Sequence, residues 1–134
     1  MKKYLFTSLL LSSIAFGDQG YEVYKNNCMA CHAELLTKKD VMANMNNLKA
    51  PPMNEVSNRL KENIIISDKN EEVKKRVVIA FIKDYIQEPL IGDTMCHAGA
   101  VERFGLMPAI THLKADELQA VAEWIYERYE NMKF

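Results

Sequence analysis

Two stretches in the second half of the chain place apolar residues at helical spacing. The first runs from residue 70 to 87 and predicts a long helix, because its apolar side chains recur three and four residues apart. We expect Ser67 or Asp68 to cap its start and Pro89 to end it. The predicted apolar stripe consists of Val73, Val77, Val78, Phe81, Ile82 and Tyr85.

The second stretch predicts a final helix over residues 114–130. Asp116 and Glu117 fall in its first turn and Arg128 in its last, which suits the helix dipole. Its apolar face is predicted to consist of Leu118, Val121, Trp124, Ile125 and Tyr129.

The first half of the chain has shorter and weaker patterns. A short helix is predicted over 20–25, running into Cys28, and another over 55–62 with Val56 and Leu60 on one side. We expect a loop or one helical turn at 41–48. An extended segment is predicted at 50–53, because its two prolines restrict the backbone and prevent a helix from continuing. The stretch 90–110 is predicted to be irregular except for a short helix at 98–104. No convincing alternation of β-strand type occurs, since the β-branched run 64–66 is only three residues long. The predicted fold class is all-α.

The amino terminus resembles a secretory leader. Lys2 and Lys3 precede a mostly apolar, uncharged stretch over 4–16, which is shorter than the roughly 20 residues of a membrane span. We therefore predict a signal peptide at 1–17, cleaved after Gly17, and one domain at 18–134; an uncleaved anchor is the alternative. The predicted location is the periplasm, with no stable membrane span after cleavage.

Charge excludes one class of partner. Without Lys2 and Lys3 the chain has 15 basic and 18 acidic residues, a net charge of −3, and it contains no basic block. A nucleic-acid-binding role is therefore not expected.

The segment Cys-Met-Ala-Cys-His, residues 28–32, is the clearest candidate for chemistry. A thioredoxin-like redox pair would need a βαβ setting, and a structural zinc site would need two further ligands close by. The adjacent histidine favours a third reading, a c-type haem attachment. Two thiols three residues apart on one helical turn can add to the two vinyl groups of a porphyrin, and the next side chain can then reach the iron. We predict one covalent haem c on Cys28 and Cys31, with His32 as an axial iron ligand.

The other axial position decides between electron transfer and small-molecule binding. We favour Met107, which precedes Pro108 in a loop that is predicted to be non-helical and stiff. Met53 and His97 are rival ligands, and Met107 could also be an ordinary core residue. With His32 and Met107 as ligands, the iron is predicted to have a fairly high potential.

The third cysteine has no partner in the attachment motif. Cys96 is followed by His97, so the pair resembles a degenerate second haem site with Asp93 in place of the first cysteine. A free thiol is the favoured interpretation. A disulfide to another chain, or a reactive thiol beside the haem, is also considered.

These residues resemble the class I c-type cytochromes over nearly the whole chain after the leader. The likeness lies in Gly20, an early Tyr24, the 28–32 motif, Met107-Pro108 and a last helix that contains Trp124. The resemblance implies a few helices wrapped around one haem, with the first and last helices crossing at Gly20 against Trp124. It also implies that Pro51 or Pro52 supplies a carbonyl to the second nitrogen of His32, which would orient the ring.

We therefore expect a monomeric, monohaem, one-electron carrier that docks transiently with redox partner proteins and is not itself an enzyme. Two alternatives remain: a haem sensor or enzyme subunit with an open iron site, and a haem-free dithiol oxidoreductase that uses Cys28 and Cys31. The residues expected to line the haem pocket include Phe81, Ile82, Leu106 and Ile110.

Overall fold

Helices account for all the regular structure in the part of the chain that the computed structural model describes, residues 16–132 and 134, where no strand occurs. This confirms the all-α prediction. The elements follow one another as α1 (Phe16–Asn27), α2 (Lys38–Asn44), the 3₁₀ helix η1 (Met45–Asn47), α3 (Met53–Asn63), α4 (Glu71–Gln87), the 3₁₀ helix η2 (Ile91–Asp93), α5 (Ala98–Phe104) and α6 (Ala115–Glu127).

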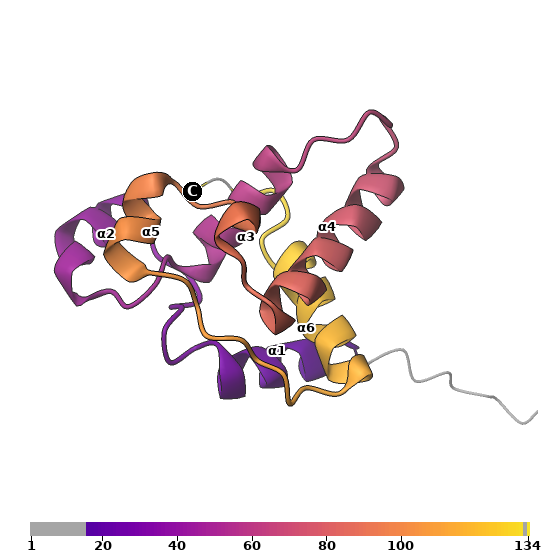
Figure 1. Ribbon diagram of the computed structural model, residues 1–134, viewed down its shortest axis with the longest axis horizontal. Helices are drawn as coiled ribbons and strands as arrows, with labels where there is room; N and C mark the ends of the chain where they lie inside the picture. Colours follow the sequence, from indigo (N-terminus) through magenta and orange to yellow (C-terminus); the bar gives the residue numbers. More distant parts are fainter. Residues whose placement is uncertain (1–15, 133) are drawn as a thin grey trace, which may run out of the picture.

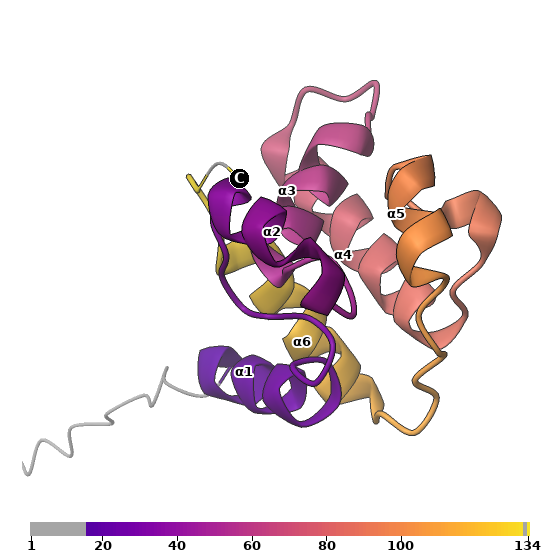
Figure 2. The ribbon, with the colours of Figure 1, turned by 90° about the vertical axis from the view of Figure 1, so that its left-hand side faces the viewer.

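The first and last helices lie against each other, with α1 running across α6 (Figures 1 and 2). Gly20 makes this contact close, because a methyl group at that position would overlap the carbonyl oxygen of Ala120 and lie 2.5 Å from Cβ of Trp124. Trp124 also stacks on Tyr24 of α1, with ring centroids 4.6 Å apart. The predicted crossing at Gly20 with Trp124 against it is confirmed.

Helix α4 packs on the other side of α6, but not with the predicted stripe. Its buried residues are Val78, Ile79, Ile82 and Ile86. Of the predicted stripe, Val78 and Ile82 are buried, whereas Val77 is 39% exposed and Phe81 is only partly buried. The helix is apolar on more than one face, so periodicity alone does not tell which face α6 covers.

The predicted N-cap of α4, Ser67 or Asp68, is wrong. Asn70 is the N-cap, and its side-chain oxygen accepts hydrogen bonds from the backbone N–H groups of Glu72 and Val73. Asp68 does not cap the helix itself. Its carboxylate accepts a hydrogen bond from the N–H of the N-cap residue, Asn70. The helix ends at Gln87, before Pro89, as predicted.

Several other bounds differ from the prediction. Helix α2 and η1 together span 38–47 and so cover most of 41–48, where a loop or one turn was expected. Thr37 and Asp40 form a reciprocal capping box that begins α2. Helix α3 begins at Met53, directly after Pro52, which supplies the extended N-cap conformation. Helix α6 ends at Glu127 and turns follow it, so the predicted helix over 114–130 is too long.

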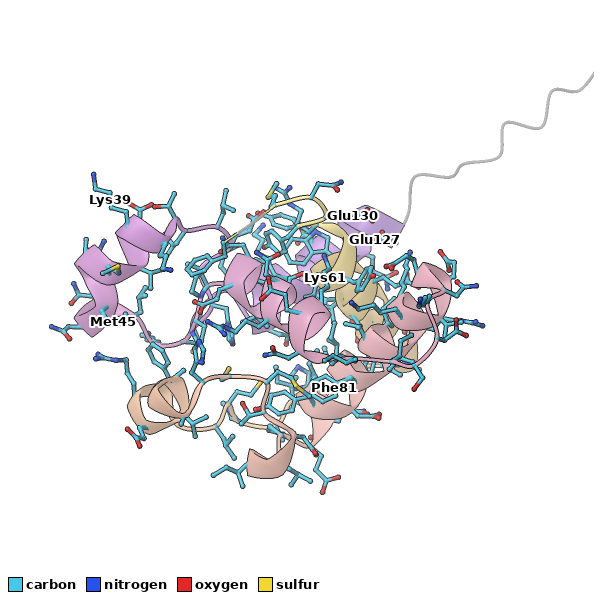
Figure 3. All side chains as sticks on the ribbon, turned by 90° about the horizontal axis from the view of Figure 1, so that it is seen from above. Lys39, Met45, Lys61, Phe81, Glu127 and Glu130 are labelled. Carbon is cyan, nitrogen blue, oxygen red and sulfur yellow. The ribbon has the colours of Figure 1, made fainter. Side chains whose placement is uncertain are left out.

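Helix α2 and η1 form one end of the molecule, away from the side chains that lie beside α3 and α6 near its middle (Figure 3). Figure 3 shows Lys39 and Met45 at the end formed by α2 and η1, far from Lys61, Glu127 and Glu130 beside α3 and α6. Arg103 of α5 and Asn46 of η1 share a 3.4 Å hydrogen bond that links two short elements distant in the sequence.

The predicted leader falls mainly on residues 1–15, which lie outside the described part of the chain, so the signal peptide and its cleavage after Gly17 stay predictions. Within the residues that are described, no helix is both long and apolar enough to cross a membrane.

Candidate functional site

The Cys28–His32 segment forms a tight turn at the end of α1. The N–H of Cys28 donates to the carbonyl of Tyr24 at 2.8 Å, and the N–H groups of Cys31 and His32 both donate to the carbonyl of Cys28, at 3.1 and 2.9 Å. Helical hydrogen bonding thus continues through the motif and brings the two thiols and the imidazole together in one turn. Cys28 is buried and Cys31 is exposed, and neither forms a disulfide.

The two thiols have different environments. Burial, together with a smaller effect of the neighbouring Cys31, raises the pKa of Cys28 to about 11. Cys28 is therefore a protonated thiol at neutral pH. Catalytic dithiols instead have a nucleophilic cysteine of lowered pKa, because the thiolate is the species that attacks.

The imidazole of His32 is fixed by the backbone of a distant proline. Its Nδ1 lies 2.7 Å from the carbonyl oxygen of Pro51. A carbonyl can only accept, so Nδ1 carries the proton and Nε2 keeps the lone pair that a metal ligand needs. Burial lowers the pKa of His32, against the opposing effect of the Pro51 hydrogen bond, so the ring is neutral at neutral pH. Of the two prolines that the resemblance implied, Pro51 is the one that makes this contact.

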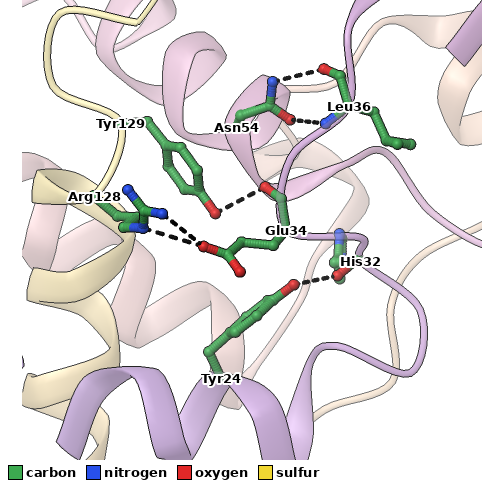
Figure 4. Close-up of polar contacts among 7 residues, drawn as sticks. All are labelled: Tyr24, His32, Glu34, Leu36, Asn54, Arg128 and Tyr129. Atoms are coloured by element: carbon green, nitrogen blue, oxygen red, sulfur yellow. Dashed lines mark hydrogen bonds and ion pairs between the residues drawn. The ribbon is translucent and has the colours of Figure 1, made fainter. Parts of the chain in front are cut away.

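The chain that follows His32 is irregular, and three other parts of the molecule hold it (Figure 4). The hydroxyl of Tyr24 in α1 donates to the carbonyl of His32 at 2.7 Å. The hydroxyl of Tyr129, after α6, donates to the carbonyl of Glu34 at 2.8 Å. Asn54 of α3 bonds both the N–H and the carbonyl of Leu36, at 3.2 and 2.9 Å. Sequence reasoning missed this role of Tyr129 and Asn54, since neither lies near the motif in the chain.

Met107 lies in the non-helical stretch between α5 and α6, as predicted, and is partly buried. Gly105 ends α5 with φ +69°, a backbone conformation that favours glycine. The N–H of Ile110 donates to the carbonyl of Ile86 at 2.9 Å, which ties this stretch to the end of α4. Neither hydrogen bonds nor core packing among the described residues link Met107 to the attachment turn, so its role as an iron ligand stays a prediction.

The rival ligands have different settings. Met53 is 3% exposed within the hydrophobic core, and its N–H donates to the carbonyl of Ala33. His97 is exposed at the N-cap position of α5, and Cys96 beside it is an exposed free thiol. These positions favour a packing role for Met53 and do not connect Cys96 or His97 to the 28–32 turn.

His112 is exposed, and it makes one contact with α1. Its Nε2 lies 2.9 Å from the side-chain oxygen of Asn27, the last residue of α1. Asn27 in turn donates to the carbonyl of Val23 at 2.9 Å. The loop after Met107 is thereby joined to the residue that directly precedes Cys28, a contact that no local sequence pattern indicates.

The donor set fits a haem, and part of the apolar surface of α4 and of the loop before α6 is left uncovered. The turn offers two unlinked thiols and one neutral imidazole with a free nitrogen. Val77 and Leu106 are 39% and 38% exposed, and Phe81 and Tyr85 stack on each other with centroids 5.8 Å apart while both are only partly buried. A flat apolar group would cover such side chains and remove them from water. Of the predicted pocket residues, Ile82 is instead buried in the core with α6.

A structural metal ion fits less well. Among the residues that the structure describes, no group of three or more His, Cys, Asp and Glu side chains lies close enough to hold a metal ion. A zinc site with protein ligands alone would need such a group.

Comparison with known proteins agrees with this chemistry. The family described as "Cytochrome C oxidase, cbb3-type, subunit III" matches residues 15–125. An uncharacterized protein of Aquifex aeolicus (strain VF5) is 41% identical over 122 residues, covering 84% of this chain and 75% of the relative. No solved structure matches the chain.

Proposed function

This chain belongs to the cbb3-type subunit III family of cytochrome c domains and is a class I c-type cytochrome, and from that premise we propose that it is an exported, periplasmic monohaem electron carrier. Cys28 and Cys31 bind the haem through two thioether bonds, and His32 and Met107 are the axial ligands of its iron. When bound, the haem supplies a one-electron couple, while the protein supplies the ligands, the apolar cover and the docking surface.

The hydrogen bond between His32 Nδ1 and the Pro51 carbonyl is the observation that supports this proposal most strongly. It sets the tautomer of the imidazole and leaves Nε2 available to the iron.

The haem-free dithiol alternative has weaker support. A Cys28 thiol with a pKa near 11 would attack a disulfide slowly at neutral pH, and the described part of the chain contains no sheet beside the motif. In the proposed haem-bound protein, the Cys28 thiol has added to a haem vinyl group, and burial of the Cys28 side chain protects the resulting thioether bond from solvent.

A pyridine haemochrome spectrum of the purified protein, taken after acid–acetone extraction, tests haem attachment. We expect one haem per chain that resists extraction and is lost in a Cys28→Ala, Cys31→Ala double variant. Colourless protein from a host with cytochrome maturation machinery, or haem that extracts completely, would contradict the proposal.

Met107→Ala tests the second ligand. A methionine ligand raises the haem potential, so its loss should lower the midpoint potential markedly and abolish the near-infrared absorption of a sulfur-ligated ferric haem. Met42→Ala is the matched control, because Met42 is 69% exposed on α2 and should leave both readouts unchanged. Unchanged spectra in Met107→Ala would exclude Met107 as the ligand.

Carbon monoxide separates a carrier from a sensor or an enzyme subunit with an open iron site. The reduced parent protein should not bind carbon monoxide at neutral pH, because both axial positions are filled, whereas reduced Met107→Ala should bind it. Rapid binding by the parent protein would favour the open-site alternative.

Cys96→Ser tests the number of haems. Cys96 is exposed and no described contact joins it to the 28–32 turn, so the variant should keep the full haem content of the parent, one per chain. A loss of haem on this substitution, measured by the same haemochrome assay, would revive the second attachment site.

A further inference from the structure

The backbone from His32 to Leu36 has no regular secondary structure, yet its polar groups are well satisfied. The N–H groups of Met53 and Asn54, which begin α3, donate to the carbonyls of Ala33 and Glu34 at 2.7 and 3.3 Å. The first N–H groups of a helix lack partners within the helix, so this segment and α3 satisfy each other. The Asn54 side chain adds the two hydrogen bonds to Leu36 described above.

Two tyrosine hydroxyls complete this arrangement (Figure 4). Tyr24 belongs to α1 and Tyr129 follows α6, and their hydroxyls donate to the carbonyls of His32 and Glu34. The two rings are 0% and 1% exposed and both pack against Trp124, with centroid distances of 4.6 and 5.9 Å. Each hydroxyl is therefore held by a rigid aromatic cluster at the crossing of the first and last helices.

His32 is thus held at both of its ends. Its ring is bonded to Pro51 and its backbone carbonyl to Tyr24, so neither end can turn without breaking a hydrogen bond. We propose that Tyr24 and Tyr129 are positioning residues for the axial histidine, which use the α1–α6 aromatic cluster to fix the 32–34 backbone and hence the orientation of the His32 ring. This inference rests on the proposed function, because it assigns these hydroxyls a purpose only if His32 binds iron.

Both tyrosines keep their protons under ordinary conditions. Burial raises the pKa of Tyr24 to about 12, with a further contribution from Glu34, and burial is also the main reason why the pKa of Tyr129 is raised. A tyrosinate could not donate to a carbonyl, so protonation preserves both hydrogen bonds at neutral pH.

The consequence for the iron follows from the Pro51 hydrogen bond. A carbonyl that accepts from the far nitrogen of a ligating histidine makes the imidazole more basic, which favours ferric iron and lowers the potential. If the backbone of His32 moves, the ring leaves its best alignment with Pro51 and this effect weakens. Loss of either tyrosine hydroxyl should therefore raise the potential.

The test uses the haem-loaded protein with Tyr24→Phe, Tyr129→Phe and Tyr126→Phe. Phenylalanine preserves each aromatic contact and removes only the hydroxyl. Tyr126 is the matched control, because it is buried on α6 near Tyr129 and its hydroxyl makes no hydrogen bond within the described part of the chain. We expect a higher midpoint potential in the first two variants and the parent value in the control.

Amide hydrogen exchange supplies a second measurement. The N–H groups of His32 and Leu36 are both hydrogen-bonded, to the Cys28 carbonyl and the Asn54 side chain. Loss of one neutral hydrogen bond corresponds to about a fivefold change in a local opening equilibrium, so these two amides should exchange about fivefold faster in the Tyr24 and Tyr129 variants. Exchange in the control should be unchanged.

The outcomes separate the two proposals. A parent protein without covalent haem overturns both of them. A normal haem content with a potential at or below the parent value in Tyr24→Phe overturns the positioning role and leaves the carrier function intact. If Tyr24→Phe fails to fold, Tyr129→Phe decides by the same criterion.

Discussion

Ser57 donates its hydroxyl proton to the carbonyl of Ile125 at 2.7 Å inside the core, where both residues are buried. Like Tyr24 and Tyr129, it satisfies a polar group that the packing of helices would otherwise leave in an apolar setting. None of these partners is predictable from spacing, because each bond joins residues of different elements. At this scale the sequence indicates the chemistry of a side chain, and the fold decides which backbone atom it meets.

The capping box of α2 leads to a prediction about pH. Hydrogen bonds from the hydroxyl and backbone of Thr37 lower the pKa of Asp40, and the N–H of Asp40 donates to the Thr37 hydroxyl oxygen at 3.1 Å. Since the folded pKa is the lower one, the cap stabilises α2 above the ordinary pKa of aspartate, near 3.9, and this contribution is lost as the pH falls through the folded value.

Thr37→Ala should therefore raise the pKa of Asp40 toward its ordinary value and increase fraying of α2. An NMR titration of the Asp40 carboxyl carbon measures the first effect, and amide exchange over 40–44 measures the second. Thr111→Ala, in the exposed loop before α6, is the control. An Asp40 titration identical in Thr37→Ala and the parent would show that the box does not form in solution.

At the scale of elements, the crossing of α1 and α6 positions the attachment turn. Gly20 lets the two helices approach, and the aromatic rings of Tyr24 and Trp124 fill the space one turn further along. Cys28 follows one turn later, directly after α1 ends at Asn27, and packs in the same core cluster. The direction in which α1 delivers the motif therefore depends on how closely the two helices cross.

Gly20→Ala should weaken this crossing, because the new methyl group would overlap backbone rather than a movable side-chain end. We expect a loss of about 1–3 kcal/mol in the free energy of unfolding, the usual cost of overpacking a core. Urea denaturation followed by circular dichroism measures it.

Gly99→Ala is the matched control for this experiment. Gly99 lies within α5 and a methyl group there would meet nothing within 4 Å, so alanine should leave stability unchanged or raise it by up to about 1 kcal/mol. Equal effects of the two substitutions would show that the close crossing at Gly20 does not limit stability.

At the scale of the whole molecule, helix packing covers only one side of α4. Its residues that face α6 are buried, whereas Val77, Phe81 and Tyr85 keep part of their surface exposed. Leu106, in the loop before α6, is similarly exposed. A bound haem would add apolar contacts to the modest core that a chain of this size can form.

The Cys28→Ala, Cys31→Ala double variant should therefore be less stable than the parent as well as free of covalent haem. A ligand that binds only the folded state stabilises it, so removing the haem should lower the thermal midpoint and increase binding of an apolar dye. Cys96→Ser should match the parent in both measurements. A haem-free double variant with the parent's thermal midpoint would mean that the helices bury their apolar faces without the cofactor.

Much of the site was predictable because it depends on neighbours in the chain. The thiols and the imidazole lie in one turn because Cys28, Cys31 and His32 are adjacent, and the absence of strands in the described residues agrees with the helical periodicity. Caps were less predictable. Asn70 rather than Ser67 or Asp68 caps α4, because several polar residues precede the helix and only the path of the loop selects one.

Local periodicity and the spacing of a few reactive side chains were enough to indicate the helical class, the family and a turn that brings Cys28, Cys31 and His32 together. Only the tertiary structure decided that α4 turns Ile79 and Ile86 toward the core, that Pro51 rather than Pro52 holds His32, and that Tyr129 reaches Glu34 across 95 residues. The physical reason is that a face or a hydrogen-bond partner is chosen by competition among distant groups. That competition is resolved only when the helices pack.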